Sequence, residues 1–266
     1  MKMLIIGSSD TRGATLPDPS QAWPNLVAAE LTRVLGEPVD FVDLPLVPVG
    51  PKAVPRVESA LDREHPDIVV CSAGAYQFIV GTVGLRVRRR YGERAYRWFR
   101  KLETGFERKT ASPSGGPART NHAARWLARR VIGAEAPSTK EEVTRVQTEM
   151  FHKLSQREGM IVVLLTTPPI GESLEKENKG ANRLLTEHQE RMGAVARSHH
   201  FLIADCRPGF AAAAKVALRH SDGVHKGATG HRIQADAILS ALLGSPSPLA
   251  PGEPAPPASA PGRTGA

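Results

Sequence analysis

Five short runs of apolar and β-branched residues recur along most of the chain. They span residues 3–7, 39–43, 67–72, 160–166 and 201–205. The runs lack the polar alternation of a half-exposed strand, which is typical of parallel strands covered on both faces. We therefore expect five buried parallel strands.

Helical periodicity fills most of the intervals between these runs. The expected helices span residues 22–35, 53–64, 138–156, 174–198 and 231–243. Gly36 is a stop signal after the first helix, and Ser138 with Glu141 reads as a capping box that opens the third. Strands alternating with helices predict an α/β domain with a doubly wound, five-stranded parallel sheet and right-handed crossovers.

Two segments depart from this rhythm. Roughly 85 residues separate the third and fourth strands, far more than one crossover helix needs. They hold a helical pattern over 87–108, a Pro/Gly/Ser loop at 112–117 and a second helix near 122–131. We expect one domain over 1–244, in which 82–157 form a helical insertion or lid. The Pro/Ala-rich tail, 245–266, should be disordered.

The net charge of +8 is concentrated in the insertion. Residues 86–133 contain 14 Lys/Arg and 3 Asp/Glu, a balance of +11, so the rest of the chain is slightly acidic. A solvated lid helix is the simplest interpretation. Aromatic residues such as Tyr91 and Trp98 interleave the charges, so recruitment to an anionic membrane surface or an acidic carrier is the alternative. Nucleic-acid binding is not expected, because no recognised binding motif accompanies the charge.

The remaining composition is that of an ordinary globular protein, with 41% hydrophobic residues. The N-terminal apolar run is too short for a signal peptide, and no run approaches the roughly 18 apolar residues of a membrane span. Without a secretory signal, Cys71 and Cys206 are expected to be buried thiols rather than a disulfide. These features favour a cytoplasmic location.

Two polar motifs near opposite ends of the domain are the strongest candidates for chemistry. The first is Gly7-Ser8-Ser9-Asp10-Thr11-Arg12-Gly13, and the second is Ser221-Asp222-Gly223-Val224-His225. A serine nucleophile needs an imidazole to take its proton, and a carboxylate can hold that imidazole in the required tautomer. Each motif alone is more often a plain loop. Together, in the order Ser…Asp…His, they favour a catalytic triad.

These motifs resemble the SGNH (GDSL-type) hydrolases, whose first block reads roughly Gly-Asp-Ser-x-Thr-x-Gly and whose last reads Asp-x-x-His. Supporting features are Ala22-Trp23-Pro24, Asp67-Ile68-Val69-Val70 and Thr166-Thr167-Pro168-Pro169, and the similarity extends over residues 2–243. The resemblance implies a flavodoxin-like doubly wound sheet. It also implies Ser9 as nucleophile, Asp222 as orienting acid and His225 as base.

The resemblance further implies an oxyanion hole. Its backbone donors would be Ser9 and a second-block glycine, for which Gly50 is the candidate, although a turn glycine is an equally good interpretation. The third block reads Gly74-Ala75-Tyr76-Gln77 where the family has Gly-x-Asn-Asp. Gly74 and Tyr76 are therefore also expected to line the substrate site. Tyr76 could replace the missing Asn donor, although its hydroxyl reaches farther. Ser8 stands where the family has Asp.

The resemblance thus implies a serine hydrolase that cleaves carboxylic esters or thioesters of small molecules through an acyl-enzyme. Neither a metal nor another cofactor is expected. Two alternatives stay open. A related acyltransferase would differ only in its acceptor, and a catalytically weakened member of the fold that binds a ligand would fit the departures at Ser8 and Tyr76. His231, which lies in a similar-looking Gly-His pair, is expected to have a packing or helix-start role.

Overall fold

The computed structural model describes residues 1–7, 11, 13, 16–46, 49–72, 76–110, 130–213 and 223–244, with side chains left out at 102–110 and 173. Three predicted site residues lie outside this set: Ser9, Gly74 and Asp222. The expected loop at 112–117, nearly all of the second insertion helix and the tail from residue 245 lie outside it as well.

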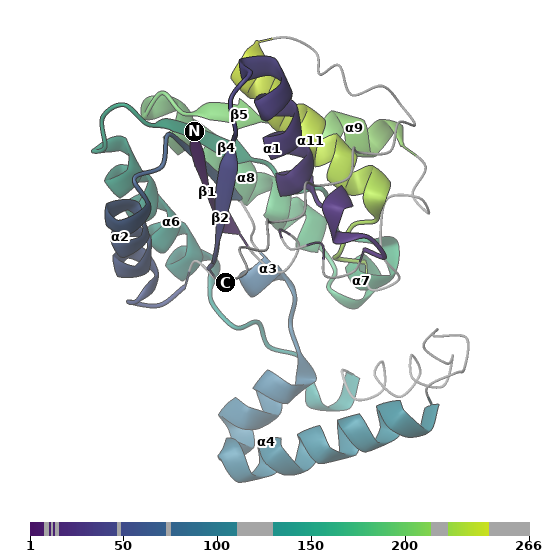
Figure 1. The fold of residues 1–266 in the computed structure, drawn as a ribbon. Helices are drawn as coiled ribbons and strands as arrows, with labels where there is room; N and C mark the ends of the chain where they lie inside the picture. The colour runs from purple at the N-terminus through teal and green to yellow at the C-terminus, as the bar shows by residue number, and fades with distance from the viewer. Residues whose placement is uncertain are drawn as a thin grey trace, which may run out of the picture.

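The described strands form one parallel sheet with the order β2-β1-β3-β4-β5 (Figure 1). The strands are β1 (Lys2–Gly7), β2 (Asp40–Pro45), β3 (Ile68–Ser72), β4 (Ile161–Leu165) and β5 (Leu202–Ala204). This order is that of a flavodoxin-like doubly wound sheet, with β1 and β3 meeting where the winding direction reverses. The predicted strands and the predicted fold class are confirmed.

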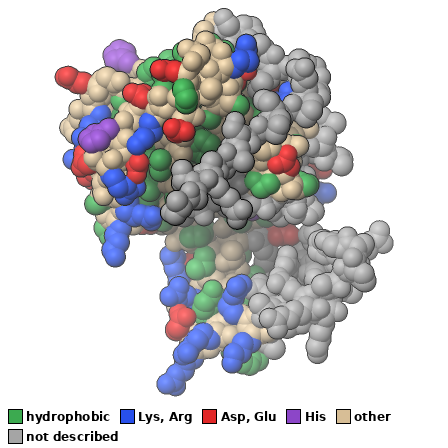
Figure 2. Space-filling model, viewed as in Figure 1, with side chains coloured by type: hydrophobic (Ala, Val, Ile, Leu, Met, Phe, Trp, Pro, Cys, Tyr) green, Lys and Arg blue, Asp and Glu red, His purple; other side chains and the backbone are tan. Residues whose placement is uncertain are grey.

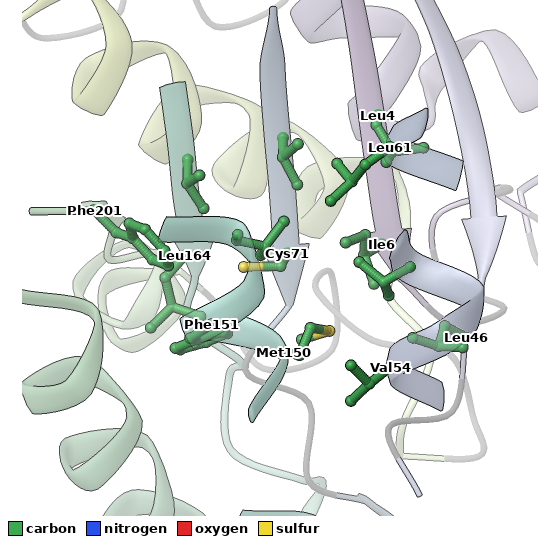
Figure 3. Packing of buried hydrophobic residues seen from close by; sticks show 14 of the residues in the cluster. Leu4, Ile6, Leu46, Val54, Leu61, Cys71, Met150, Phe151, Leu164 and Phe201 are labelled. Carbon is green, nitrogen blue, oxygen red and sulfur yellow. The ribbon is translucent and has the colours of Figure 1, made fainter. Parts of the chain in front are cut away.

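Successive side chains of the central strands point to opposite faces, and both faces are buried. On one face, Leu4 and Ile6 pack with Val54, Met150 and other residues from α2 and α6 (Figure 3). On the other, Met3 and Ile5 pack against α1 and α11. Burial on both faces explains why the strand sequences are continuous apolar runs.

The helices follow the expected alternation. The helices around the sheet are α1 (Trp23–Leu35), α2 (Ala53–Glu64), α6 (Lys140–Ser155), α7 (Glu172–Glu177), α8 (Ala181–Ser198), α9 (Arg207–Ala212) and α11 (Ala228–Leu243), with a 3-10 turn, η2 (Pro19–Gln21), before α1. The last helix begins about one turn earlier than predicted, at Ala228, and its N-cap is Gly227.

Two further predictions about the helices were wrong. The N-cap of α6 is Thr139, whose hydroxyl accepts a hydrogen bond of 3.1 Å from Glu142 N, so the expected capping box at Ser138 is shifted by one residue. The expected helix 174–198 is two helices, α7 and α8. They separate because Gly180, at the N-cap of α8, adopts a left-handed backbone conformation.

The insertion begins after the short helix α3 (Tyr76–Ile79) and contains α4 (Val83–Thr110), which is kinked at Gly92. Thr82 and Glu135 join its two ends through a pair of backbone hydrogen bonds of 2.9 and 3.1 Å. The expected insertion range, 82–157, also includes α6. That helix packs its apolar side into the core of the sheet and serves as the crossover helix to β4.

Candidate functional site

The carboxyl ends of all five strands lie at one edge of the sheet, and the predicted motifs follow these ends. β1 ends at Gly7, two residues before Ser9, and β3 ends at Ser72, shortly before Tyr76. Since β1 and β3 are the strands at which the winding reverses, a crevice for ligands is expected beside them. The two motifs around Ser9 and Tyr76 therefore follow the strands that border this crevice.

Two described residues of the first motif, Gly7 and Thr11, pack closely at the end of β1. Thr11 is buried, and its hydroxyl donates a hydrogen bond of 2.8 Å to Asp43 Oδ1 on the adjacent strand β2. Its methyl group lies over Gly7, where an added Cβ would come within 2.2 Å of Thr11 Cγ2. Glycine at position 7 therefore leaves room for the Thr11 side chain at the end of β1.

The loop after β4 is held by two amide side chains of α8. Gln189 accepts a hydrogen bond of 2.6 Å from Thr167 N and donates one of 2.9 Å to Thr167 O. Two helical turns earlier, Asn182 accepts from Ile170 N at 2.7 Å and donates to Ile170 O at 3.3 Å. Each amide thus satisfies both polar groups of one backbone residue, as a neighbouring strand would. This pair of clamps fixes the path of the loop toward Gly171.

Gly171 connects this loop to the segment that carries His225. Its N–H donates a hydrogen bond of 2.8 Å to Gly223 O. The two backbones lie so close that a Cβ on Gly171 would come within 2.9 Å of Gly223 Cα. Gly223 adopts a φ of 74°, which favours glycine. His225, half-buried, follows two residues later, so the β4 loop determines where the proposed base is held.

Lys226 connects the histidine segment to the start of α3. It is buried, with 3% of its surface exposed, and its Nζ lies 5.6 Å from the centre of the half-buried Tyr76 ring. This distance is within the range of a cation–π contact. The third-block tyrosine and the residue after the proposed base are therefore neighbours in space.

The two cysteines are buried thiols, as predicted. Burial raises the pKa of the Cys71 thiol to about 12. Burial also raises the pKa of Cys206, to about 11, although the Thr166 hydrogen bond and the charge of Lys226 act in the opposite direction. Since a thiolate is the reactive form of cysteine, these raised pKa values make both thiols poor nucleophiles.

The structure shows the backbone or side-chain contacts of two further candidates from the sequence, Gly50 and His231. Gly50 has a φ of 76°, and its carbonyl accepts a hydrogen bond of 3.3 Å from Ala53 N, which is the geometry of a turn glycine. His231 is fully buried, and its Nδ1 accepts a hydrogen bond of 3.3 Å from Trp23 N, which agrees with the expected packing role.

Among the residues that the structure describes, no cluster of metal-binding side chains is present. None of the described helices combines the length and apolar character needed to cross a membrane.

Several positioning residues were missed by sequence reasoning. The amides of Asn182 and Gln189 are seven residues apart, a spacing that places both on one face of α8. That spacing was the only available signal, because amide side chains on a helix are usually solvent-facing. Gly171 and Lys226 gave no signal at all, since their partners are distant in sequence.

No protein-family model matches the chain, and a search of curated proteins gives no significant match. Solved structures are similar to it. They include TesA (TM-score 0.53, 15% identity), the acetylxylan esterase Axe2 from Geobacillus stearothermophilus (0.53, 15%) and a member of the lipolytic protein G-D-S-L family from Veillonella parvula DSM 2008 (0.54, 14%). Each alignment covers 91% of this chain and, in the same order, 98%, 93% and 98% of the other. The chain therefore has the fold of SGNH (GDSL-type) hydrolases, as the motifs predicted.

Proposed function

We propose that the protein is a serine hydrolase that cleaves carboxylic ester or thioester bonds, with Ser9 as nucleophile, His225 as base and Asp222 as the orienting acid. The observation that carries the proposal is the link from Gly171 to Gly223. That hydrogen bond joins the His225 segment to the loop that follows the carboxyl end of β4, and β1 ends on the same side of the parallel sheet, two residues before Ser9. The solved esterase of the same fold supports this class of substrate.

In the proposed reaction, His225 takes the proton of the Ser9 hydroxyl as the oxygen attacks the substrate carbonyl. Collapse of the tetrahedral intermediate expels the alcohol or thiol, which His225 protonates, and leaves Ser9 acylated. Water, activated by the same imidazole, then releases the acid. Asp222 would hold the imidazole tautomer and stabilise its cationic form.

The developing oxyanion needs hydrogen-bond donors, and loss of one such donor typically costs on the order of 10²–10³ in rate. We propose the N–H groups of Ser9 and Gly50 as backbone donors, with Gly74 lining the substrate site. Tyr76 is the proposed side-chain donor. Its contact with the buried Lys226 supports this role, because a nearby ammonium favours donation by a phenol to an anion.

Labelling with a fluorophosphonate probe tests the nucleophile. The wild-type protein should be labelled, Ser9→Ala should not, and Ser8→Ala serves as the matched control that should retain labelling. Equal labelling of the wild type and Ser9→Ala would overturn the assignment.

Turnover of short-chain nitrophenyl esters separates an enzyme from a ligand-binding relative of the same fold. Activity that disappears in His225→Ala would end the binding alternative, which is motivated by Tyr76 standing where the family has Asn. Added alcohols distinguish an acyltransferase, because transesterified product would then accumulate at the expense of the free acid.

A further inference from the structure

The helical insertion carries an exposed surface that the proposed chemistry does not use. In Figure 1, α4 projects away from the layers of the α/β domain, and Figure 2 shows Lys and Arg side chains gathered over this projecting part. Within residues 83–101, where side chains are described, eight Lys or Arg residues accompany a single acid, Glu93. The projection is therefore strongly cationic.

Part of this charge is used within the insertion. Glu135 pairs with Arg86 at 3.7 Å and with Arg89, and Glu93 pairs with Arg88 at 2.7 Å. Arg88 also lies 5.7 Å from the Tyr96 ring. These contacts lie on the part of α4 before the kink and around it, so they stabilise the projection itself.

After the kink at Gly92, α4 presents a different face. Its sequence spacing places four exposed residues on one side of the helix: Arg94, Arg97, Trp98 and Lys101. Trp98 is 65% exposed. On the part of the chain that the structure describes, Arg94 and Arg97 make no ion pair. The inner side of this helix is apolar, because Tyr96 and Phe99 pack toward Gly84.

An exposed tryptophan surrounded by cations has a specific physical preference. Its indole ring combines a large apolar surface with a polar N–H, which suits the boundary between lipid headgroups and acyl chains. Lys and Arg can bury their aliphatic stems beside such a ring while their charges reach anionic headgroups. Tyr91, 60% exposed near the kink, adds a second amphipathic ring to the projection.

We propose that the face formed by Arg94, Arg97, Trp98 and Lys101 docks the protein onto an anionic lipid surface. Cationic charge alone would equally suit an acidic carrier protein or a nucleic acid. We favour a lipid surface because the Trp98 ring lies at the centre of the face, between cationic side chains of the same helix. None of these four residues is a Ser, Thr, Asn or Gln, the side chains that commonly contact bases and polar protein surfaces.

Flotation with lipid vesicles tests the proposal on the full-length protein. Vesicles of phosphatidylcholine containing about one-third phosphatidylglycerol should carry the protein upward, whereas pure phosphatidylcholine should not. Arg94→Gln/Arg97→Gln/Lys101→Gln should weaken the binding at least tenfold. The matched control Arg145→Gln/Arg183→Gln/Arg197→Gln removes the same charge from exposed positions of α6 and α8 and should leave binding nearly unchanged.

A second measurement tests insertion of the ring. Anionic vesicles should shift the fluorescence of the wild type to shorter wavelength, and this shift should be absent in Trp98→Phe. Circular dichroism of each variant establishes that folding is intact.

Three results would overturn the proposal: no binding to anionic vesicles at about 0.1 M salt, equal binding of the insertion variant and the wild type, or an unshifted Trp98 signal. Binding to single-stranded RNA or to an acidic carrier protein in place of vesicles would assign the face to that partner instead. Esterase activity in detergent-free buffer is measured in parallel, since the docking face can fail while the proposed chemistry stands.

Discussion

The Gly171 N–H and the Gly223 carbonyl are joined by a hydrogen bond of 2.8 Å, and this bond connects the loop after β4 to the segment that carries His225. A Cβ on Gly171 would come within 2.9 Å of Gly223 Cα, so position 171 has no room for a side chain unless the Gly223 backbone moves. We therefore expect the placement of the proposed base to depend on a backbone contact made outside the proposed triad.

Gly171→Ala should reduce kcat/KM by on the order of 10², because its Cβ would push Gly223 and move His225 from its working position. Steady-state kinetics on a short-chain nitrophenyl ester measures the effect, and a melting curve checks that the fold survives. Gly193→Ala is the matched control, since a Cβ there meets only ordinary contacts at 3.6 Å or more. Full activity of Gly171→Ala would contradict the role assigned to this contact.

Gln189→Leu should destabilise the protein by about 1–3 kcal/mol, because the N–H and carbonyl of Thr167 would lose their buried partner. Urea unfolding measures the free energy. Arg183→Gln, an exposed change on the same helix, should alter it by less than about 0.5 kcal/mol. If both variants unfold at the same urea concentration as the wild type, the amide clamp does not stabilise the loop.

Tyr76→Phe should lower kcat by on the order of 10²–10³ with little change in KM, as expected of a donor that acts mainly on the oxyanion. Tyr91→Phe, which removes a hydroxyl from the exposed insertion, is the control and should be fully active. Wild-type kcat in Tyr76→Phe would show that the backbone donors suffice without this hydroxyl.

The stability of the protein should fall as the pH decreases from about 6.5 toward 4, in part because of His188. This side chain is fully buried, with its Nε2 2.7 Å from Gln147 Oε1, and burial lowers its pKa from 6.5 to about 4. Below pH 6.5 the unfolded chain binds a proton there that the folded chain does not, so protonation favours unfolding.

Between pH 7.5 and pH 5 this linkage corresponds to about 2 kcal/mol. Urea unfolding at the two pH values measures it, and His188→Gln should show a pH dependence smaller by that amount. An identical pH dependence in the two proteins would mean that other groups account for the loss. The predicted window lies above pH 4, because below this value both states are protonated at His188.

Truncation after Gly244 should leave both the melting temperature and kcat unchanged. The expected disordered tail has too little apolar surface to offset the entropy of ordering it. Gly244 also ends α11 in a left-handed conformation, which is a natural stop for the domain. A drop of several degrees in the melting temperature would show that the tail packs on the domain.

The strands, the fold class and the positions of the candidate motifs could be predicted from the amino-acid pattern. Strands buried on both faces need unbroken apolar runs such as Val69-Val70, and this requirement is local enough to be visible in the chain. Because these runs alternate with helices, the sequence also predicts a doubly wound parallel sheet. The left-handed turn at Gly180, by contrast, was not distinguishable from a tolerated helix glycine.

The contacts that support the candidate site, by contrast, became visible only in the folded protein. The amide clamps of Asn182 and Gln189, the close approach of Gly171 to Gly223 and the contact of Lys226 with Tyr76 all join segments far apart in sequence. No periodicity or capping rule encodes such pairs, because each depends on how separate loops meet at the edge of the sheet. Local preferences fix the elements, whereas the packing of those elements selects which polar groups become neighbours.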